Sequence, residues 1–179
     1  VDAVTALLTR GADTNATEAS RGQTALMWAA WEGHTEVVGA LLEHGVDMHA
    51  RSTTGYSALL LAAREGYLAT TQALLASGAD VNDAAEDGTT ALVVATIRGH
   101  TTFAEFLLDQ GADPNRGPGF LPLHWAAGVF DTELNDFSNG ITSADTEWSA
   151  FGGLPGPERI AFVKVLLAHG ADPNARARR

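Results

Sequence analysis

Glycine recurs at a fixed interval along this chain, and the interval is the strongest constraint on its fold. One series opens Gly-x-Asp triplets at spacings of 34, 33 and 33 residues, at Gly11, Gly45, Gly78 and Gly111. Two further series keep the spacing of 33 residues, at Gly22, Gly55 and Gly88 and at Gly33, Gly66 and Gly99. Three series in one phase indicate a repeat protein, in which short units stack side by side.

Each repeat unit predicts two short helices. A hydroxyl residue (Thr24, Ser57 or Thr90) precedes an apolar run of about two turns and is placed to cap the start of a helix. This first helix ends at the third glycine series, where a left-handed backbone favours glycine. A second amphipathic helix follows and ends at the Gly-x-Asp glycine or, in the last unit, at Gly170. The polar residues between units suit hairpin-like turns.

These units resemble those of the ankyrin-repeat family. The resemblance rests on the pattern Gly-x-Thr-Ala-Leu-x-x-Ala-Ala-x-x-Gly-His at residues 22–34 and on Gly-Ala-Asp-Val-Asn at residues 78–82. It implies an all-α solenoid whose concave face carries the first helices and the turn tips, and it implies a protein-binding role. We expect a single domain over residues 1–179, divided into a half unit at 1–16, units at 17–50, 51–83 and 84–116, and a unit with an insertion at 117–179.

The phase of the units is most similar to bacterial ankyrin proteins, some of them exported. That similarity favours a bacterial cytoplasmic, periplasmic or exported protein. The chain begins within a unit and without an initiating Met, so we expect a piece of a longer array.

The last unit is longer than the others. Leu123 and Gly170 lie 47 residues apart, whereas the equivalent Leu92 and Gly111 lie 19 apart, so 28 residues are inserted at about 130–157. The insertion contains five acidic residues, no Lys or Arg, and the aromatic residues Phe130, Phe137, Trp148 and Phe151. Loops of this length are usually functional or disordered, and the aromatic residues argue against disorder, so we expect the insertion to pack back on the solenoid.

Composition excludes several classes of function. The net charge is −11 and Lys164 is the sole lysine, which argues against binding of a nucleic-acid backbone. Cysteine is absent, so disulfides and thiolate metal sites are excluded. No apolar run approaches the length that a membrane-spanning helix needs.

We expect neither an active site nor a metal or other cofactor. The six histidines show no helical pairing typical of zinc sites, and His34, His100 and His124 are expected to satisfy backbone groups between units. The acidic stretch 131–136 lacks the glycine and the distal glutamate of calcium loops. The repeated aspartates Asp13, Asp80, Asp113 and Asp172 are expected to build turns. A metal-dependent active site near His124 and Asp131 is the least favoured alternative.

The ankyrin resemblance implies which residues face the concave side. Stacking is expected to align six of them along one groove, and the insertion adds a seventh: Trp31, Tyr56, Arg64, Ile97, Arg98, Phe120 and Trp148. All but Ile97 are aromatic residues or arginines, the types that anchor interfaces. In the alternative interpretation Trp31 simply packs on Arg64 or in the core. Trp28 and Trp125 replace the family's buried leucine and are expected in the core.

The favoured function is therefore a monomeric, non-catalytic module that binds a protein or peptide in this groove. The apolar anchors would be Trp31, Tyr56 and Phe120. Arg64 and Arg98 would pair with acidic groups of the partner, and the acidic insertion would bind a basic segment. The alternative function is a structural spacer within a longer array that has no partner of its own.

Overall fold

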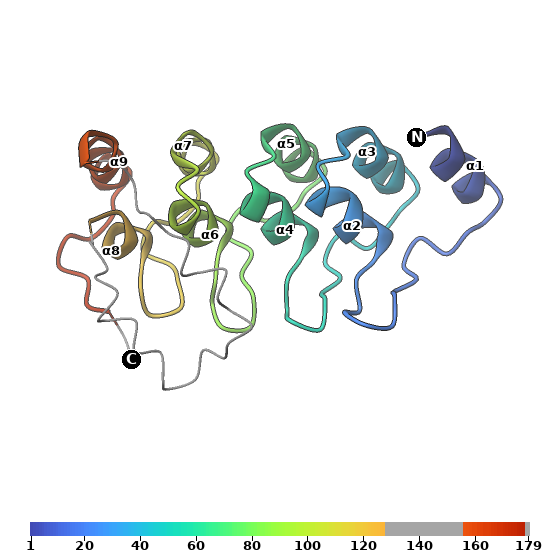
Figure 1. Cartoon of the computed structure of the whole chain (residues 1–179), viewed down its shortest axis with the longest axis horizontal. Helices are drawn as coiled ribbons and strands as arrows, with labels where there is room; N and C mark the ends of the chain where they lie inside the picture. The colour runs from blue at the N-terminus through green and yellow to red at the C-terminus, as the bar shows by residue number, and fades with distance from the viewer. Residues whose placement is uncertain (128–155, 178–179) are drawn as a thin grey trace.

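The fold is an all-α stack of helix pairs. A computed structural model of the chain describes residues 1–127 and 156–177, and helices are the only regular elements in those ranges. Figure 1 shows the helices in two rows along the long axis of the molecule. In chain order they are α1 (Asp2–Thr9), α2 (Ala25–Trp31), α3 (Thr35–Glu43), α4 (Ala58–Glu65), α5 (Leu68–Ala76), α6 (Ala91–Ile97), α7 (Thr101–Asp109), α8 (Pro122–Ala127) and α9 (Gly156–Ala168).

The first helices (α2, α4, α6 and α8) begin as the sequence predicts. The side-chain oxygens of Thr24, Ser57 and Thr90 accept the backbone N–H of Met27, Leu60 and Val93 at 3.3, 3.4 and 3.3 Å. These caps satisfy one of the N–H groups that a helix start leaves without a helical partner. In the last unit Pro122 is the first helical residue, where its missing N–H costs nothing.

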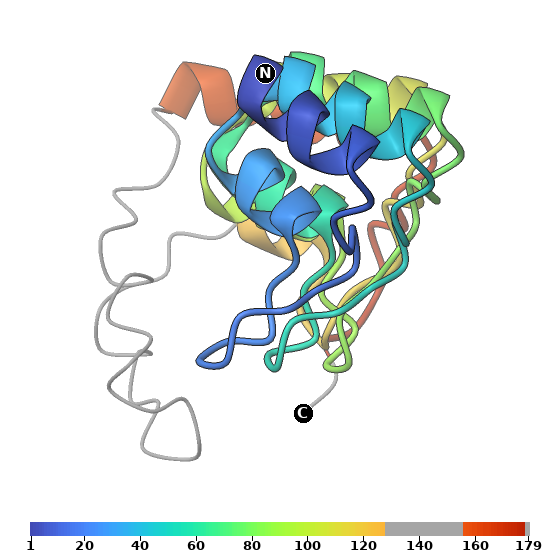
Figure 2. The ribbon, with the colours of Figure 1, turned by 90° about the vertical axis from the view of Figure 1, so that its right-hand side faces the viewer.

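The second helices (α1, α3, α5, α7 and α9) form the other row. The pairs α2–α3, α4–α5 and α6–α7 turn at glycines of positive φ, such as Gly33 at +69° and Gly66 at +75°, as the glycine spacing predicts. The connections between units are extended hairpins that all project from the same side of the stack (Figure 2), with short antiparallel bridges at Thr17–Thr24 and Ala84–Thr90.

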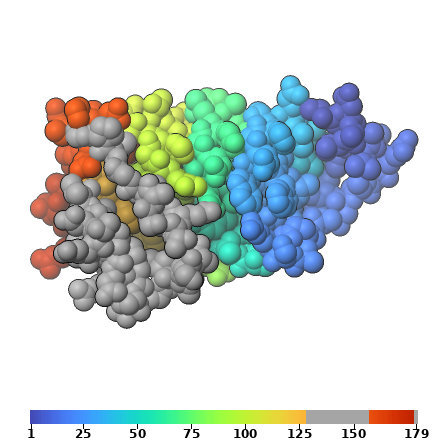
Figure 3. Space-filling view, in the orientation of Figure 1, coloured from blue at the N-terminus to red at the C-terminus, as the bar shows by residue number. Residues whose placement is uncertain are grey.

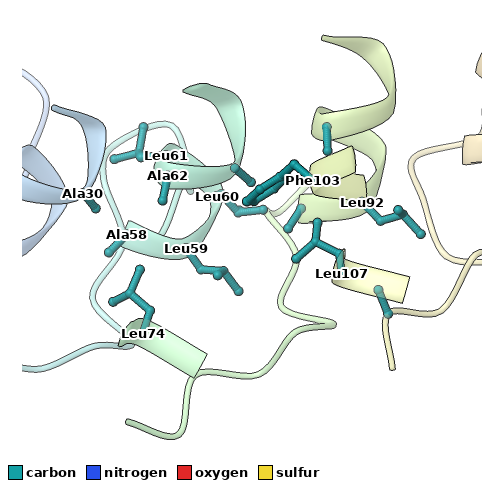
Figure 4. Packing of buried hydrophobic residues seen from close by; sticks show 14 of the residues in the cluster. Ala30, Ala58, Leu59, Leu60, Leu61, Ala62, Leu74, Leu92, Phe103 and Leu107 are labelled. Carbon is teal, nitrogen blue, oxygen red and sulfur yellow. The ribbon is translucent and has the colours of Figure 1, made fainter. Parts of the chain in front are cut away.

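The core lies between the rows and runs the length of the stack. Each first helix packs on the next first helix, and each pairs with its own second helix. Fully buried alanines, such as Ala30, Ala62 and Ala95, let neighbouring helices approach closely. Apolar side chains from α4, α5, α6 and α7 meet in this layer (Figure 4), so no unit buries its apolar surface alone.

Two hydrogen-bond patterns hold the turns in register, and the first confirms that the repeated aspartates build turns. The carboxylate of each aspartate accepts a hydrogen bond from the backbone N–H two residues later, as Asp80 Oδ1 does from the Asn82 N–H at 2.9 Å. The asparagine then reaches the next unit. Asn82 Oδ1 accepts the N–H of Asp113 at 2.7 Å, and its Nδ2 donates to the carbonyl of Gly111 at 3.1 Å. Equivalent bonds join Asn15 to Asp47, and Asn115 to Asp172 and Gly170.

This series of asparagine hydrogen bonds between units is interrupted at His49, which occupies the position that asparagine has in the other units. His49 is exposed, and its ring makes no such bond within the described residues. We predict that His49→Asn restores bonds to Asp80 N–H and to the Gly78 carbonyl and raises the free energy of unfolding by about 0.5 to 1.5 kcal/mol. Urea denaturation measures the change. The reverse substitution Asn82→His serves as the matched variant and should lower stability by a similar amount; equal stability of all three proteins would contradict the prediction.

One core assignment from the sequence is wrong. Trp28 was expected in the core, yet 44% of it is exposed. Its equivalents in the next two units, Leu61 and Val94, are buried because another first helix precedes each of theirs. No described helix precedes α2 in its row, so Trp28 has no such cover. Trp125 is half-buried, and the predicted packing of the insertion lies outside the described residues.

Candidate partner-binding site

The candidate site lies on the last turns of the first helices. Trp31, Arg64 and Ile97 occupy equivalent positions at the ends of α2, α4 and α6, so stacking places them one after another along the row. Figure 3 shows the molecule in space-filling form, with the repeat units following one another from the N-terminal half unit in dark blue toward α9 in orange. The repeat spacing thus brings together residues that lie 33 positions apart in the sequence.

Trp31 is the centre of an arginine–tryptophan cluster, which we define as Arg21, Trp31, Arg64, Glu65 and Arg98. Its indole stacks on that of Trp28, with ring centroids 5.6 Å apart and planes 23° from parallel. The guanidinium carbons of Arg21 and Arg64 lie 5.5 and 5.9 Å from the Trp31 ring centroid. These distances suit cation–π attraction, which orders the arginines while the ring stays half-buried.

Glu65 joins the two arginines that the sequence assigned to the site. Its Oε1 lies 3.6 Å from Arg64 Nε and 3.6 Å from Arg98 Nη2. The side chains are only 28 to 32% exposed, so the charges are partly shielded from solvent. One carboxylate between two guanidinium groups leaves a net positive charge here, on a chain whose net charge is −11.

The remaining predicted residues differ in accessibility. Ile97 is only 8% exposed, so it supports the face from beneath and offers little surface to a partner. Tyr56 is half-buried on the hairpin that precedes α4. Phe120 is 43% exposed and lies against α8, with centroids 6.0 Å from His124 and 5.8 Å from Trp125. Trp148 lies outside the described residues.

Glu18 fixes the backbone from which Arg21 projects. Its carboxylate accepts the N–H groups of Ser20 and Arg21 at 2.6 Å each and that of Gln23 at 3.2 Å. Hydrogen bonds from the Ser20 side chain and backbone, with those from Gln23 and Arg21, lower the pKa of Glu18 from 4.5 to about 2. At neutral pH a charged Glu18 carboxylate therefore holds the tip of the hairpin before α2. The held backbone places Arg21 beside Trp31.

Two of the three histidines expected to satisfy backbone groups do so. His100 Nε2 lies 3.3 Å from the Arg64 carbonyl of the preceding unit. His124 Nδ1 accepts the Leu121 N–H at 2.9 Å, so its Nε2 carries the proton and donates to the Ala175 carbonyl at 2.9 Å. His34 is exposed.

His169 is held at the end of α9. Hydrogen bonds to the Val165 carbonyl and to Asp109 raise the pKa of His169. Among the described residues no group of three potential ligands is arranged to hold a metal ion.

The site residues predicted from the sequence do not include Arg21, Glu65 or Trp28, and Trp28 is instead predicted in the core. The spacing of Trp28 and Trp31 was a usable signal, because residues three apart share one side of a helix. Glu65 and Arg98 also stand at equivalent places in successive units, which made their contact predictable. Arg21 had no comparable signal, since its place depends on the path of the hairpin.

Within the described ranges the helix pairs stack so that each packs mainly on its neighbours, and such a stack is a helical solenoid. A family model for ankyrin repeats (3 copies) matches residues 1–85 and 59–132, and the chain belongs to the ankyrin-repeat family. No curated protein shows a match to the chain. Ankyrin repeats are generally protein-interaction modules and generally non-catalytic. No helix in the described ranges is both long enough and apolar enough to cross a membrane.

Proposed function

We propose that this chain binds a protein or peptide partner along the row of first helices, with the arginine–tryptophan cluster as its centre. The observation that carries the proposal is the half-buried Trp31 ring between two arginine side chains. Aromatic and arginine side chains of this kind supply most of the binding energy in many interfaces. Their order before binding reduces the entropy that a partner must offset.

The chemistry of the cluster favours an acidic segment that also carries apolar side chains. Guanidinium groups stacked on an indole keep their N–H edges oriented for carboxylates. Trp31, Tyr56 and Phe120 would contact apolar side chains, while Arg64 and Arg98 would exchange their shared contact with Glu65 for carboxylates of the partner. We further propose that the insertion, through Trp148 and its acidic residues, contacts a basic segment of the same partner.

Selection from a random peptide library on the immobilised chain tests the proposal. We predict that selected peptides are enriched in Asp, Glu and aromatic residues, and that Trp31→Ala with Tyr56→Ala weakens their binding by about tenfold or more. Fluorescence polarisation measures the affinities. Leu68→Ala is the matched control, since Leu68 is an exposed apolar residue at the start of α5, in the other row.

Unchanged affinity in the double variant would contradict the proposal that peptides bind in the groove through Trp31 and Tyr56. Selection of peptides without acidic enrichment would refute the role of the arginines. Replacing Asp131, Glu133 and Asp136 by the corresponding amides should weaken the binding only of peptides that contain Lys or Arg. An equal effect on all peptides would contradict the proposal that the insertion contacts a basic segment.

A further inference from the structure

Glu65 lies between Arg64 and Arg98 and forms a hydrogen bond to neither. Its Oε1 is 3.6 Å from Arg64 Nε and 3.6 Å from Arg98 Nη2. Charge-assisted hydrogen bonds between guanidinium and carboxylate groups span only about 2.7 to 2.9 Å. The two arginines therefore attract one oxygen atom from two units of the stack, and that oxygen does not reach hydrogen-bond distance of either.

The position of Glu65 in the chain explains these long contacts. Glu65 is the last residue of α4 and directly follows Arg64, and the side chains of adjacent helical residues do not face each other. Arg98 directly follows α6 and approaches from the next unit. The Glu65 carboxylate is thus attached to a backbone that it shares with one of its partners. An acidic group from a separate molecule has no such restraint.

The charge of the incoming group decides how much it gains over Glu65. A carboxylate of a partner has the same charge and the same number of oxygens as Glu65, so its ion pairs replace ion pairs that the chain already makes. A phosphorylated side chain carries a charge of about −1.5 to −2 at neutral pH and three acceptor oxygens. It gains over Glu65 in charge as well as in geometry, whereas a carboxylate gains in geometry alone.

The rest of the arginine–tryptophan cluster also suits a dianion. Its three arginines outnumber its one glutamate, and a single carboxylate does not balance that excess. The guanidinium carbon of Arg64 lies 5.9 Å from the Trp31 ring centroid, which restricts the arginine before a ligand binds. The side chains at the shared contact are 28 to 32% exposed, so salt screens their charges less than it does on an open surface.

We propose that the arginine–tryptophan cluster binds a phosphorylated side chain of the partner, whose phosphate takes the place of the Glu65 carboxylate between Arg64 and Arg98. The inference rests on the proposed function and names the acidic group that the groove favours. A peptide fits better than a phosphoinositide membrane, because the net charge of −11 opposes approach to an anionic surface. A single phosphorylated side chain also reaches a partly shielded site that a flat surface does not enter.

A peptide library with a fixed central phosphoserine, selected on the intact chain, tests the inference. Each recovered sequence is also made with glutamate and with serine at the centre. We expect the phosphoserine peptides to bind about tenfold more tightly than the glutamate peptides, because the phosphate adds at least one charge-assisted hydrogen bond. Fluorescence polarisation measures the affinities. Arg98→Gln should remove the preference, and Arg116→Gln, at an exposed arginine on the connection before α8, is the matched control that should keep it.

Glu65→Gln gives an independent readout, because it removes the charge of the internal competitor and keeps the shape of the side chain. It should strengthen the binding of both phosphoserine and glutamate peptides severalfold. Unchanged affinity for the phosphoserine peptides would contradict the placement of the phosphate between Arg64 and Arg98. Circular dichroism verifies that each variant is folded.

Equal affinity for phosphoserine and glutamate peptides, or equal effects of Arg98→Gln and Arg116→Gln, would overturn the inference. So would vesicles containing a phosphoinositide that bind the chain more tightly than every phosphoserine peptide and lose that binding in Arg98→Gln. The proposed function is separately testable. Glutamate peptides that still bind through Trp31 and Tyr56 would support it after such a failure, whereas absence of binding by any peptide would contradict both.

Discussion

Replacing Leu92 by alanine is expected to lower the free energy of unfolding by about 2 to 5 kcal/mol. Leu92 lies on α6 in the middle of the stack and is 1% exposed (Figure 4). Its side chain belongs to the continuous core between the two rows, so its removal loses buried apolar surface and leaves a cavity between units. In a solenoid each unit is stabilised by its neighbours, so a defect in a central unit weakens contacts on both of its sides.

The matched control uses the same substitution at the end of the stack. Leu167 on α9 is 42% exposed, and its replacement by alanine should cost no more than about 0.5 kcal/mol. Urea denaturation followed by far-ultraviolet circular dichroism measures both changes. Equal losses in the two variants would show that the stability of the stack does not depend on its central core.

The arrangement of the helices was predictable from sequence because it depends on local chemistry. A hydroxyl residue before an apolar run and a glycine after it set the start and end of each first helix, independently of distant residues. Thr24, Ser57 and Thr90 act as caps, and Gly33 and Gly66 adopt positive φ, as this local chemistry requires. The repeat spacing then placed equivalent residues in neighbouring units side by side.

Burial was less predictable because it depends on which neighbours are present. The residue type at position 28 resembles that of a core position, and its equivalents Leu61 and Val94 are buried. Trp28 is exposed only because no described helix precedes α2, a fact that a single unit's pattern does not contain. Ile97 shows the reverse case, since a residue assigned to the surface is buried.

The charge of the candidate site also needed the structure. The sequence assigned Arg64 and Arg98 to a partner's acidic groups, and the structure shows that both already contact Glu65. Under the proposed function a partner would therefore compete with an internal carboxylate, which lowers the net gain from each new ion pair. Since one carboxylate of Glu65 contacts both arginines, the proposed acidic segment would gain most where it brings more than one carboxylate to them.

Replacing Gly33 by alanine is expected to cost about 2 to 4 kcal/mol, because two effects act at one position. Gly33 has a φ of +69°, which a residue with a Cβ adopts at a cost of about 1 to 2 kcal/mol. A Cβ at this position would also lie 2.9 Å from Cδ1 and Cε1 of the Tyr67 ring, inside van der Waals contact. Tyr67 is the residue that precedes α5, the second helix of the next unit. Displacing its ring therefore disturbs the boundary between two units.

Gly45→Ala separates the two effects. Gly45 has a similar φ of +74°, but nothing lies within 4 Å of the place its Cβ would take. Thermal and urea denaturation should therefore show the backbone cost alone in Gly45→Ala and a larger loss in Gly33→Ala. Adding Tyr67→Ala to each glycine variant should remove most of that difference, because the contact disappears with the ring. If Gly33→Ala and Gly45→Ala lose equal stability, the Tyr67 ring moves freely, and the close approach at Gly33 does not hold the two units together.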